Sequence, residues 1–313
     1  MATPKDMPRR FRAMLRSGES FVQPGAFNAQ SAKIAEAAGF RTVCVSGYGV
    51  SATLLGKPDV GLVTLTEAVQ MTGYICDAVN IPVLADGDTG YGNAINAMRT
   101  VEQFIKAGVG GLFIEDQVSP KRCGHVSGKQ VIPLAEAFGK YRAAVKVRDE
   151  LDPDVVLVAR CDARGVAGGS LDEVVLRCKA YRDAGVDVVF PEGVLSRDEL
   201  ARVAREVEMP LLYNRTGVSP NMTLAEMRDL RIFVVINANG AMRAAARAMW
   251  DYLHAFARED AALDVRLNAE IKDHPLADFH AFAGFPEIRK LETEFLPADE
   301  VAKKYAGSIG FTP

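Results

Sequence analysis

No stretch of the sequence approaches the roughly 20 consecutive apolar residues that a membrane-spanning helix needs. Basic residues are in slight deficit, because 37 Lys and Arg stand against 40 Asp and Glu and leave a formal net charge of −3. Residues 1–18 are rich in arginine, but no apolar stretch follows that would make a signal peptide. The sequence therefore predicts a cytoplasmic protein that neither enters a membrane nor binds nucleic acid through its phosphate backbone.

Cysteine is also scarce, with five residues in a chain of 313 and no C-x-x-C pair. An odd number of scattered cysteines in an intracellular chain argues against a disulfide framework and against a structural zinc site. The hydrophobic fraction of 49%, by contrast, is high enough for a large buried core, which excludes a disordered protein. Length alone leaves open two domains or one barrel of about 250 residues.

Eight short apolar runs recur along the chain, each followed by polar or glycine residues. Near-continuous apolar strands are typical of a parallel sheet that helices cover on both faces. The runs are Phe21–Gly25, Thr42–Gly47, Pro82–Asp86, Gly111–Asp116, Val155–Arg160, Val186–Glu192, Pro210–Asn214 and Phe233–Asn237.

Helical patterns lie between the runs and end in glycine, as at Gly39, Gly108 and Gly185. Glycine after a helix supplies the left-handed residue that turns the chain into the next strand. Eight strand–helix units predict an α/β fold, a (β/α)8 TIM barrel over residues 1–240 that includes an N-terminal helix. The alternative, a doubly wound open sheet, usually carries a G-x-G-x-x-G loop after its first strand, and none is present.

Residues 241–313 lack strand patterns and are predicted to form a C-terminal helical extension. A long alanine-rich helix should contain Trp250, the only tryptophan, and breaks are expected at Pro275 and Pro286. We expect the apolar face of this extension to be buried on another subunit.

Polar residues end nearly every predicted strand, where barrels build their active sites. Asp86 and Asp88 are two apart on a segment taken as extended, so their carboxylates should share a face and repel unless a cation lies between them. Glu115 at the next strand end adds a third carboxylate, and oxygen ligands suit Mg2+ or Mn2+. The alternative is an Asx-turn sharpened by glycines. The rim residues are Ser46, Asp86, Asp88, Glu115, Arg160, Glu192, Asn214 and Asn237.

Cys123 lies in a glycine-containing loop after the fourth strand, between Lys121, Arg122 and His125. These neighbours are expected to lower the thiol pKa or to ready it for proton exchange. A zinc ligand is disfavoured because one Cys and one His are too few, and a thiol nucleophile has no evident orienting partner. A general acid on a mobile loop and a structural cysteine are the other two interpretations.

Five short motifs occur together and in order: S-G-Y-G-V-S-A from Ser46, L-G-K-P-D from Leu55, D-G-D-T-G from Asp86, E-D-Q from Glu115 and K-R-C-G-H from Lys121. In this combination, residues 20–240 resemble the isocitrate lyase/phosphoenolpyruvate mutase superfamily. The cysteine motif resembles its lyase branch, which holds 2-methylisocitrate lyase, 2,3-dimethylmalate lyase and petal-death-type oxaloacetate- and malate-cleaving enzymes. The resemblance implies a Mg2+ barrel whose eighth helix is swapped between subunits of a homotetramer, a dimer of dimers.

The same resemblance implies a function, a carbon–carbon lyase that splits a small 2-hydroxy dicarboxylate into an α-keto acid and a carboxylate. Cys123 would then be the general acid. The implied roles are metal binding for Asp86, Asp88, Glu115 and Asp59; substrate binding for Ser46, Gly47, Tyr48, Gly124, Asn214 and Arg215; and catalysis for Cys123, Arg160, His125 and Glu192. Alternatives are an oxaloacetate hydrolase or decarboxylase, a phosphonopyruvate-type P–C bond enzyme, and a non-catalytic ligand-binding member.

Three positions depart from the family pattern. Cys44 stands where lyases of the methylisocitrate type have a tyrosine. The identity of the base that deprotonates the substrate hydroxyl therefore stays open, and Tyr48 and a metal-bound water are the two candidates. The usual Arg-Thr-Asp is Arg160-Cys161-Asp162. The loop Asn214–Pro220 is shorter than usual and has no acid, so its ligand and the natural substrate stay open.

Overall fold

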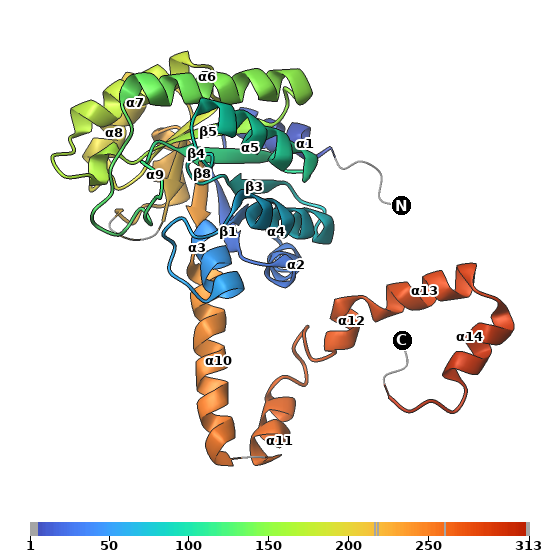
Figure 1. Ribbon diagram of the computed structural model, residues 1–313. Helices are drawn as coiled ribbons and strands as arrows, with labels where there is room; N and C mark the ends of the chain where they lie inside the picture. The colour runs from blue at the N-terminus through green and yellow to red at the C-terminus, as the bar shows by residue number, and fades with distance from the viewer. Residues whose placement is uncertain (1–5, 216, 218, 260, 311–313) are drawn as a thin grey trace. The chain divides into compact units, whose positions relative to one another are not determined.

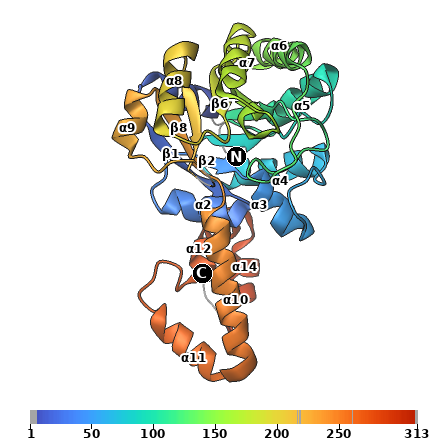
Figure 2. The same ribbon diagram turned by 90° about the vertical axis from the view of Figure 1, so that its left-hand side faces the viewer.

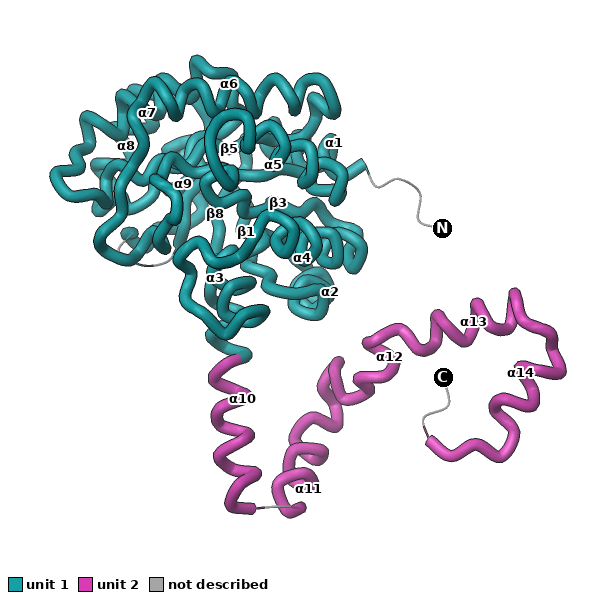
Figure 3. The backbone as a smooth tube through the Cα atoms, in the orientation of Figure 1, with its two compact units in different colours: residues 1–245 teal, residues 246–313 magenta. Residues whose placement is uncertain are grey.

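The computed structural model describes residues 6–215, 217, 219–259 and 261–310. Parts of the loop Asn214–Pro220, residues 216 and 218, lie outside this set. The chain divides into two compact units, Met1–Ala245 and Ala246–Pro313 (Figure 3). Each unit is described by itself below.

The first unit is a closed barrel of eight parallel strands in sequential order (Figure 1). Closure comes from β1, which pairs with β2 on one side and with β8 on the other, where Phe21 faces Val234. The strands are β1 Phe21–Ala26, β2 Val43–Val45, β3 Val83–Asp86, β4 Gly111–Glu115, β5 Val156–Cys161, β6 Val188–Pro191, β7 Leu211–Asn214 and β8 Ile232–Asn237. Each coincides with one of the eight apolar runs, so the predicted (β/α)8 barrel is confirmed.

Helices surround the strands on the outside of the barrel (Figure 2). Their apolar faces pack on the outward-facing strand residues and form one continuous core with them. The helical segments are α1 Met7–Arg16, α2 Ala29–Ala37, α3 Gly47–Val50, the π-helical turn Ser51–Leu55, α4 Leu65–Ala78, α5 Ala94–Lys106, α6 Leu134–Leu151, the 3-10 turn Ala163–Gly165, α7 Leu171–Asp183, α8 Arg197–Val207 and α9 Leu224–Asp229.

Helix α1 closes the amino-terminal end of the barrel. Its Phe11 is fully buried, and its ring packs edge-on against that of Phe21 with 5.9 Å between centroids. Phe11 joins the inward-facing residues of the strands in a second core cluster inside the barrel. The interior is thus filled at this end, which leaves the carboxyl ends of the strands for a site.

Glycines end three of the helices as predicted. Gly39, Gly108 and Gly185 have φ angles of 89°, 88° and 98°, in the left-handed region that side chains with a Cβ rarely adopt. Each lies where a helix turns back toward the next strand. These turns keep the connections short and bring all eight carboxyl ends to one rim.

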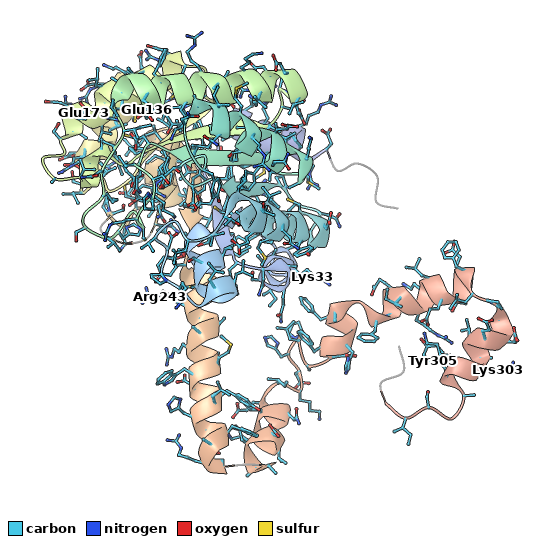
Figure 4. The ribbon with its side chains drawn as sticks, in the orientation of Figure 1. Lys33, Glu136, Glu173, Arg243, Lys303 and Tyr305 are labelled. Atoms are coloured by element: carbon cyan, nitrogen blue, oxygen red, sulfur yellow. The ribbon has the colours of Figure 1, made fainter. Side chains whose placement is uncertain are left out.

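A buried polar cluster lies behind the ends of β4 and β5. One carboxylate oxygen of Asp116 accepts a hydrogen bond of 2.9 Å from the backbone N–H of Asp162. The other accepts 2.6 Å from the Tyr181 hydroxyl and 3.2 Å from Arg177, both on α7. Arg177 also donates 2.7 Å to Glu173 on the same helix. Glu173 is labelled in Figure 4. This cluster holds the backbone of the two strand ends in register.

Tyr181→Phe removes one of these hydrogen bonds and should cost about 1–3 kcal/mol of unfolding free energy, because it leaves a buried carboxylate less satisfied. Urea denaturation measures the loss. Tyr74→Phe is the matched control, since Tyr74 is exposed and its hydroxyl accepts 2.7 Å from Gln70 on the same helix. Equal stability of the two variants would show that the Tyr181 hydroxyl contributes nothing to the barrel.

The second unit is helical, and α10 leads into it from the barrel. The helices are α10 Gly240–Glu259, α11 Ala261–Glu270, α12 Phe279–Ala283, α13 Phe285–Phe295 and α14 Ala298–Tyr305. The break predicted at Pro286 is present: α12 ends before Gly284, whose φ is 105°, and α13 begins at Phe285. Pro286 lies in the first turn of α13, where its missing N–H costs nothing. Pro275 does lie between helices.

Large apolar side chains of this unit are exposed within one chain. On α10 they include Met249, Trp250, Leu253 and Phe256, and on α13 Ile288 and Leu291. The exchange of the eighth helix between subunits stays a prediction. None of the helices in the described part of the chain combines the length and hydropathy of a membrane span.

Candidate active site

A cavity opens at the carboxyl ends of the strands. It holds about 450 Å3 of empty space, part of it open to solvent. The predicted site residues that line it are Ser46, Gly47, Tyr48, Asp59, Asp86, Cys123, Gly124, His125, Arg160, Glu192 and Asn214. These residues come from six different strand ends or the loops after them and meet in one place.

Ser46 and Gly47 form a tight corner after β2. The Ser46 hydroxyl caps α3 by accepting 3.0 Å from the backbone N–H of Gly49. The N–H of Gly47 donates 3.2 Å to the Asp86 carboxylate, and a Cβ on Gly47 would lie only 2.5 Å from that oxygen. Glycine is therefore required here, since any side chain would push Asp86 away.

Asp88 lies behind the cavity rather than on its wall. Its φ of 46° is left-handed, so the segment is not extended and the expectation that Asp86 and Asp88 share a face is wrong. The turn is held by the Asp88 N–H, which donates 3.0 Å to Asp86. The Asx-turn alternative describes the local backbone, and both carboxylates still lie near one another.

The Lys121 ammonium lies between the carboxylates of Asp59 and Asp88. It lies 2.6 Å from the Asp59 carboxylate and 2.7 Å from that of Asp88, and all three side chains are almost fully buried. Burial alone would lower the pKa of Lys121, but the surrounding carboxylates, Asp88 first, outweigh it and raise the pKa well above its ordinary value. Lys121 is therefore charged at neutral pH.

Arg160, at the end of β5, is surrounded by three acids. Its guanidinium lies 2.8 Å from Asp162, 3.1 Å from Glu115 and 4.0 Å from Glu192. It also lies over the Phe190 ring, 5.3 Å from the centroid. These contacts orient the side chain, while one edge of it still faces the cavity. Arg160 is thus both an ion-pair partner and a lining residue.

Two of the buried acids are held in an environment that disfavours their charge. Burial and the neighbouring Asp88 raise the pKa of Asp86 to about 7, although Lys121 and Arg160 oppose the shift. Burial likewise raises the pKa of Glu115 well above its ordinary value. Both oxygens of Glu115 are buried, and neither accepts a hydrogen bond from the described residues. Removal from water is thus the main cause at both positions, and the nearby cations only partly offset it.

The four predicted metal ligands are not gathered into one closed set. Among the described residues, no three His, Cys, Asp or Glu side chains lie close enough to hold one ion. Asp59 and Asp88 face Lys121, whereas Glu115 faces Arg160. The acids are thus spread around two cations of the chain.

The Cys123 thiol is partly buried and lines the cavity. Burial raises its pKa above the ordinary value, more than a hydrogen bond from the backbone N–H of His125 lowers it. The expectation of a lowered pKa is wrong, because Lys121 points to the acids and burial dominates. A thiol with a raised pKa stays protonated at neutral pH, as a proton donor must.

Cys44, which stands in the place of the family tyrosine, also lines the cavity. Burial raises the pKa of its thiol well above the ordinary value. Burial therefore keeps this thiol protonated at the cavity wall.

His125, Glu192 and Asn214 form a polar wall. The Asn214 side-chain nitrogen lies 3.2 Å from Nε2 of His125 and 3.4 Å from a Glu192 oxygen. Arg215 lies outside this cavity and donates 3.1 Å to the Met222 carbonyl of its own loop. It lines a neighbouring cavity that shares Cys123 and His125 with the first.

Two residues of the site escaped the sequence-based prediction. Lys121 was considered only for its effect on Cys123, because nothing local shows that its ammonium reaches Asp59 and Asp88. Asn239 lines the cavity and lies 3.2 Å from the Ser46 hydroxyl. Its position just after β8 was the one signal available, since strand ends supply site residues.

Acids, an arginine and a thiol that meet at the carboxyl ends of barrel strands define a barrel enzyme. Residues 11–257 match the family model described as Phosphoenolpyruvate phosphomutase. The chain therefore belongs to the PEP mutase/isocitrate lyase superfamily, and the resemblance seen in the sequence is confirmed.

Relatives of high similarity include two lyases. 2,3-Dimethylmalate lyase of Eubacterium barkeri is 37% identical over 288 residues, which cover 91% of this chain and 97% of that protein. 2-Methylisocitrate lyase of Escherichia coli (strain K12) is 39% identical over 243 residues, 77% of this chain and 81% of that protein. These names support the prediction of a carbon–carbon lyase.

Solved structures of similar proteins support the same fold and family. The crystal structure of 2,3-dimethylmalate lyase has a TM-score of 0.84 at 31% identity and covers 99% of this chain and 100% of its own. Phosphonopyruvate hydrolase in complex with oxalate and Mg2+ has a TM-score of 0.79 at 30% identity, over 93% and 100% of the two chains.

Proposed function

We propose that the protein is a Mg2+-dependent carbon–carbon lyase that cleaves a small 2-hydroxy dicarboxylate to an α-keto acid and a carboxylate. The observation that carries the proposal is the placement of a protonated thiol, Cys123, on the same small cavity as Arg160 and Asp86. Cleavage next to a hydroxyl-bearing carbon produces a carbanion, which needs positive charge as it forms and a proton afterwards.

The chemistry of the residues suits a divalent cation that keeps several water ligands, since the oxygen donors lie at one rim but are not gathered into one closed set. Negative groups are in excess at this rim, and burial, with neighbouring acids adding to it, raises the pKa values of Asp86 and Glu115. The described carboxylates at or behind the cavity are Asp59, Asp86, Asp88, Glu115, Asp162 and Glu192, and the cations among them are Lys121, Lys129 and Arg160. Asp59, Asp86, Asp88 and Glu115 would hold Mg2+, with Mn2+ as a substitute. Bound there, the ion supplies Lewis-acid stabilisation of negative charge on substrate oxygens.

Residues of the chain itself would bind the substrate and transfer the protons. Ser46, Gly47 and Tyr48 bind the carboxylate next to the hydroxyl-bearing carbon, called C2. Loss of the hydroxyl proton makes C2 a carbonyl, the C2–C3 bond breaks and its electron pair goes to C3. The Cys123 thiol delivers a proton to C3, and the resulting thiolate regains one from solvent.

Arg160 stabilises the charge that develops during cleavage, and the wall of His125, Glu192 and Asn214 orients the second half of the substrate. Gly124 lets the loop approach closely, since a Cβ there would lie 2.4 Å from Arg160. Tyr48, 37% exposed at the cavity, is our candidate for the group that accepts the hydroxyl proton.

A coupled assay tests the function. The protein is incubated with Mg2+ and 2,3-dimethylmalate, 2-methylisocitrate or other substituted malates, and the released keto acid is reduced by lactate dehydrogenase. Turnover of at least one substrate is expected. Release of oxalate and acetate from oxaloacetate, or turnover of phosphonopyruvate only, would assign the site to those reactions, and no turnover at all would overturn the enzyme proposal.

Metal binding should also be visible without substrate. At 100 times its dissociation constant, Mg2+ should raise the unfolding free energy by about 2.7 kcal/mol, because it binds the folded state alone. Thermal unfolding with and without Mg2+ measures the shift. Asp88→Asn should abolish most of it, whereas Asp172→Asn, at an exposed pair with Arg202, should leave it unchanged. A wild-type protein that Mg2+ does not stabilise would contradict the metal site.

We also propose that the protein is a homotetramer, a dimer of dimers in which the extension covers apolar surface of a neighbouring subunit. The exposed side chains of α10 and α13 support this, because monomeric proteins rarely leave such a set uncovered. The division into a barrel, residues 1–240, and an extension, residues 241–313, and the cytoplasmic location stay predictions.

A further inference from the structure

Lys129 lies at the far end of the loop that carries Cys123, and its side chain folds back into that loop. The residue is only 5% exposed. Its ammonium donates a hydrogen bond to the carbonyl of Gly124, the residue next to Cys123. The same nitrogen lies 3.6 Å from the carboxylate of Asp162, after β5. A buried lysine that touches both the loop and the adjacent strand end connects two parts of the site.

Other contacts hold the loop at its base and on its opposite side. The Gln117 side chain both donates to and accepts from the backbone of Arg122, at 2.9 and 3.0 Å. The N–H of Cys123 donates 3.1 Å to the backbone carbonyl of Asp59. Neither contact reaches the end of β5. In the described part of the loop, that connection is made by Lys129.

Space for the Lys129 ammonium is provided by Gly165, in the short turn after β5. A Cβ on Gly165 would lie 2.6 Å from Nζ of Lys129 and 2.9 Å from its Cε. The φ of this glycine is not in the left-handed region, so its backbone does not require glycine. Because Gly165 has no side chain, there is room for the Lys129 ammonium. Gly165 lies outside the loop, so this observation is independent of the contacts within the loop.

Asp162 links this lysine to the catalytic arginine. Its carboxylate accepts from Arg160 at 3.0 Å, and its backbone N–H is held by the buried Asp116. The anchor for Lys129 is therefore the same rigid group that orients Arg160. A loop tied to that anchor keeps its thiol at a fixed position relative to the arginine.

We propose that Lys129 is a positioning residue that holds the Cys123 loop closed on the cavity, through its bonds to Gly124 and Asp162. The effect on turnover rests on the proposed function of Cys123. The effect on the accessibility of the thiol does not, because it follows from the loop contacts alone.

Thiol labelling tests the proposal. Cys123 is the partly exposed cysteine, whereas Cys44, Cys76, Cys161 and Cys178 are buried, so 5,5′-dithiobis(2-nitrobenzoate) should label the folded protein at Cys123. Lys129→Met keeps the length of the side chain and removes its charge. We expect labelling about 10-fold faster or more, the effect of losing a hydrogen bond to a charged group that keeps the loop closed.

Gly165→Ala tests the same contact from outside the loop. The added methyl displaces the ammonium, so labelling should accelerate as in Lys129→Met, and combining the two changes should add little. Matched controls are Lys146→Met, at an exposed pair with Glu150, and Gly139→Ala, where a Cβ meets nothing within 4 Å. With substrate, kcat should fall more than KM changes in both test variants.

An unchanged labelling rate in a folded Lys129→Met protein would overturn the proposal. So would fast labelling in the double variant Cys123→Ser/Lys129→Met, because another thiol would then have been exposed by general loosening. Both results are obtained without substrate, so they are distinct from a failure of the lyase assay.

Discussion

Cys123→Ser should lower turnover by about 10²-fold or more, the range over which a positioned general acid contributes. Serine keeps nearly the same shape but is a far weaker acid than even a thiol whose pKa burial has raised. The keto-acid assay measures kcat, and binding of an unreactive substrate analogue should survive, because the carboxylate-binding corner at Ser46 and Gly47 is untouched.

Cys76→Ser is the matched control. Cys76 is on α4, outside the cavity, so the same chemical change there should leave kcat close to wild type. If Cys123→Ser turns over at the wild-type rate, the proton must come from another group and the assignment of Cys123 as the acid is wrong.

Arg160→Met should destabilise the protein by about 3–5 kcal/mol, the cost of leaving buried charges without their partner. Glu115, Asp162 and Glu192 all lie within 4.0 Å of the guanidinium and are almost fully buried. Chemical denaturation measures the loss. Arg202→Met is the control, because its pairs with Asp172 and Glu206 are at the surface, where such pairs contribute about 1 kcal/mol or less.

The loss of unfolding free energy in Arg160→Met should become smaller as the pH is lowered. Arg160 opposes the rise in the pKa of Glu115, so without this cation the folded pKa of Glu115 should lie still higher. The folded variant then binds more protons than the unfolded chain and gains stability as the pH falls. Burial already raises the pKa of Glu115 in the presence of Arg160. A deficit that is constant between about pH 8 and pH 6 would show that the loss is one of packing alone.

The fold was predictable because its signals are local. Each strand is a run buried on both faces, and glycines such as Gly39 and Gly108 mark the turns where a left-handed residue is needed. The location of the site followed, since strand ends of a barrel converge.

The contacts within the site were not predictable, because they join distant parts of the chain. Lys121 meets Asp59, and Lys129 meets Asp162, through loops whose path no local pattern specifies. The direction of the pKa shift at Cys123 is set by burial, whereas the cationic neighbours in the sequence indicated the opposite direction. The left-handed turn at Asp88 likewise broke the alternation expected of a strand.

The exposure of α10 also makes the chain its own spectroscopic reporter. Trp250 is the only tryptophan and is 66% exposed, so the tryptophan fluorescence of the whole protein comes from one indole in the helical extension. Its emission maximum should be red for a separate chain and shift to the blue when another surface excludes water from it. Dilution followed by fluorescence would therefore report association of the extension, with no label attached.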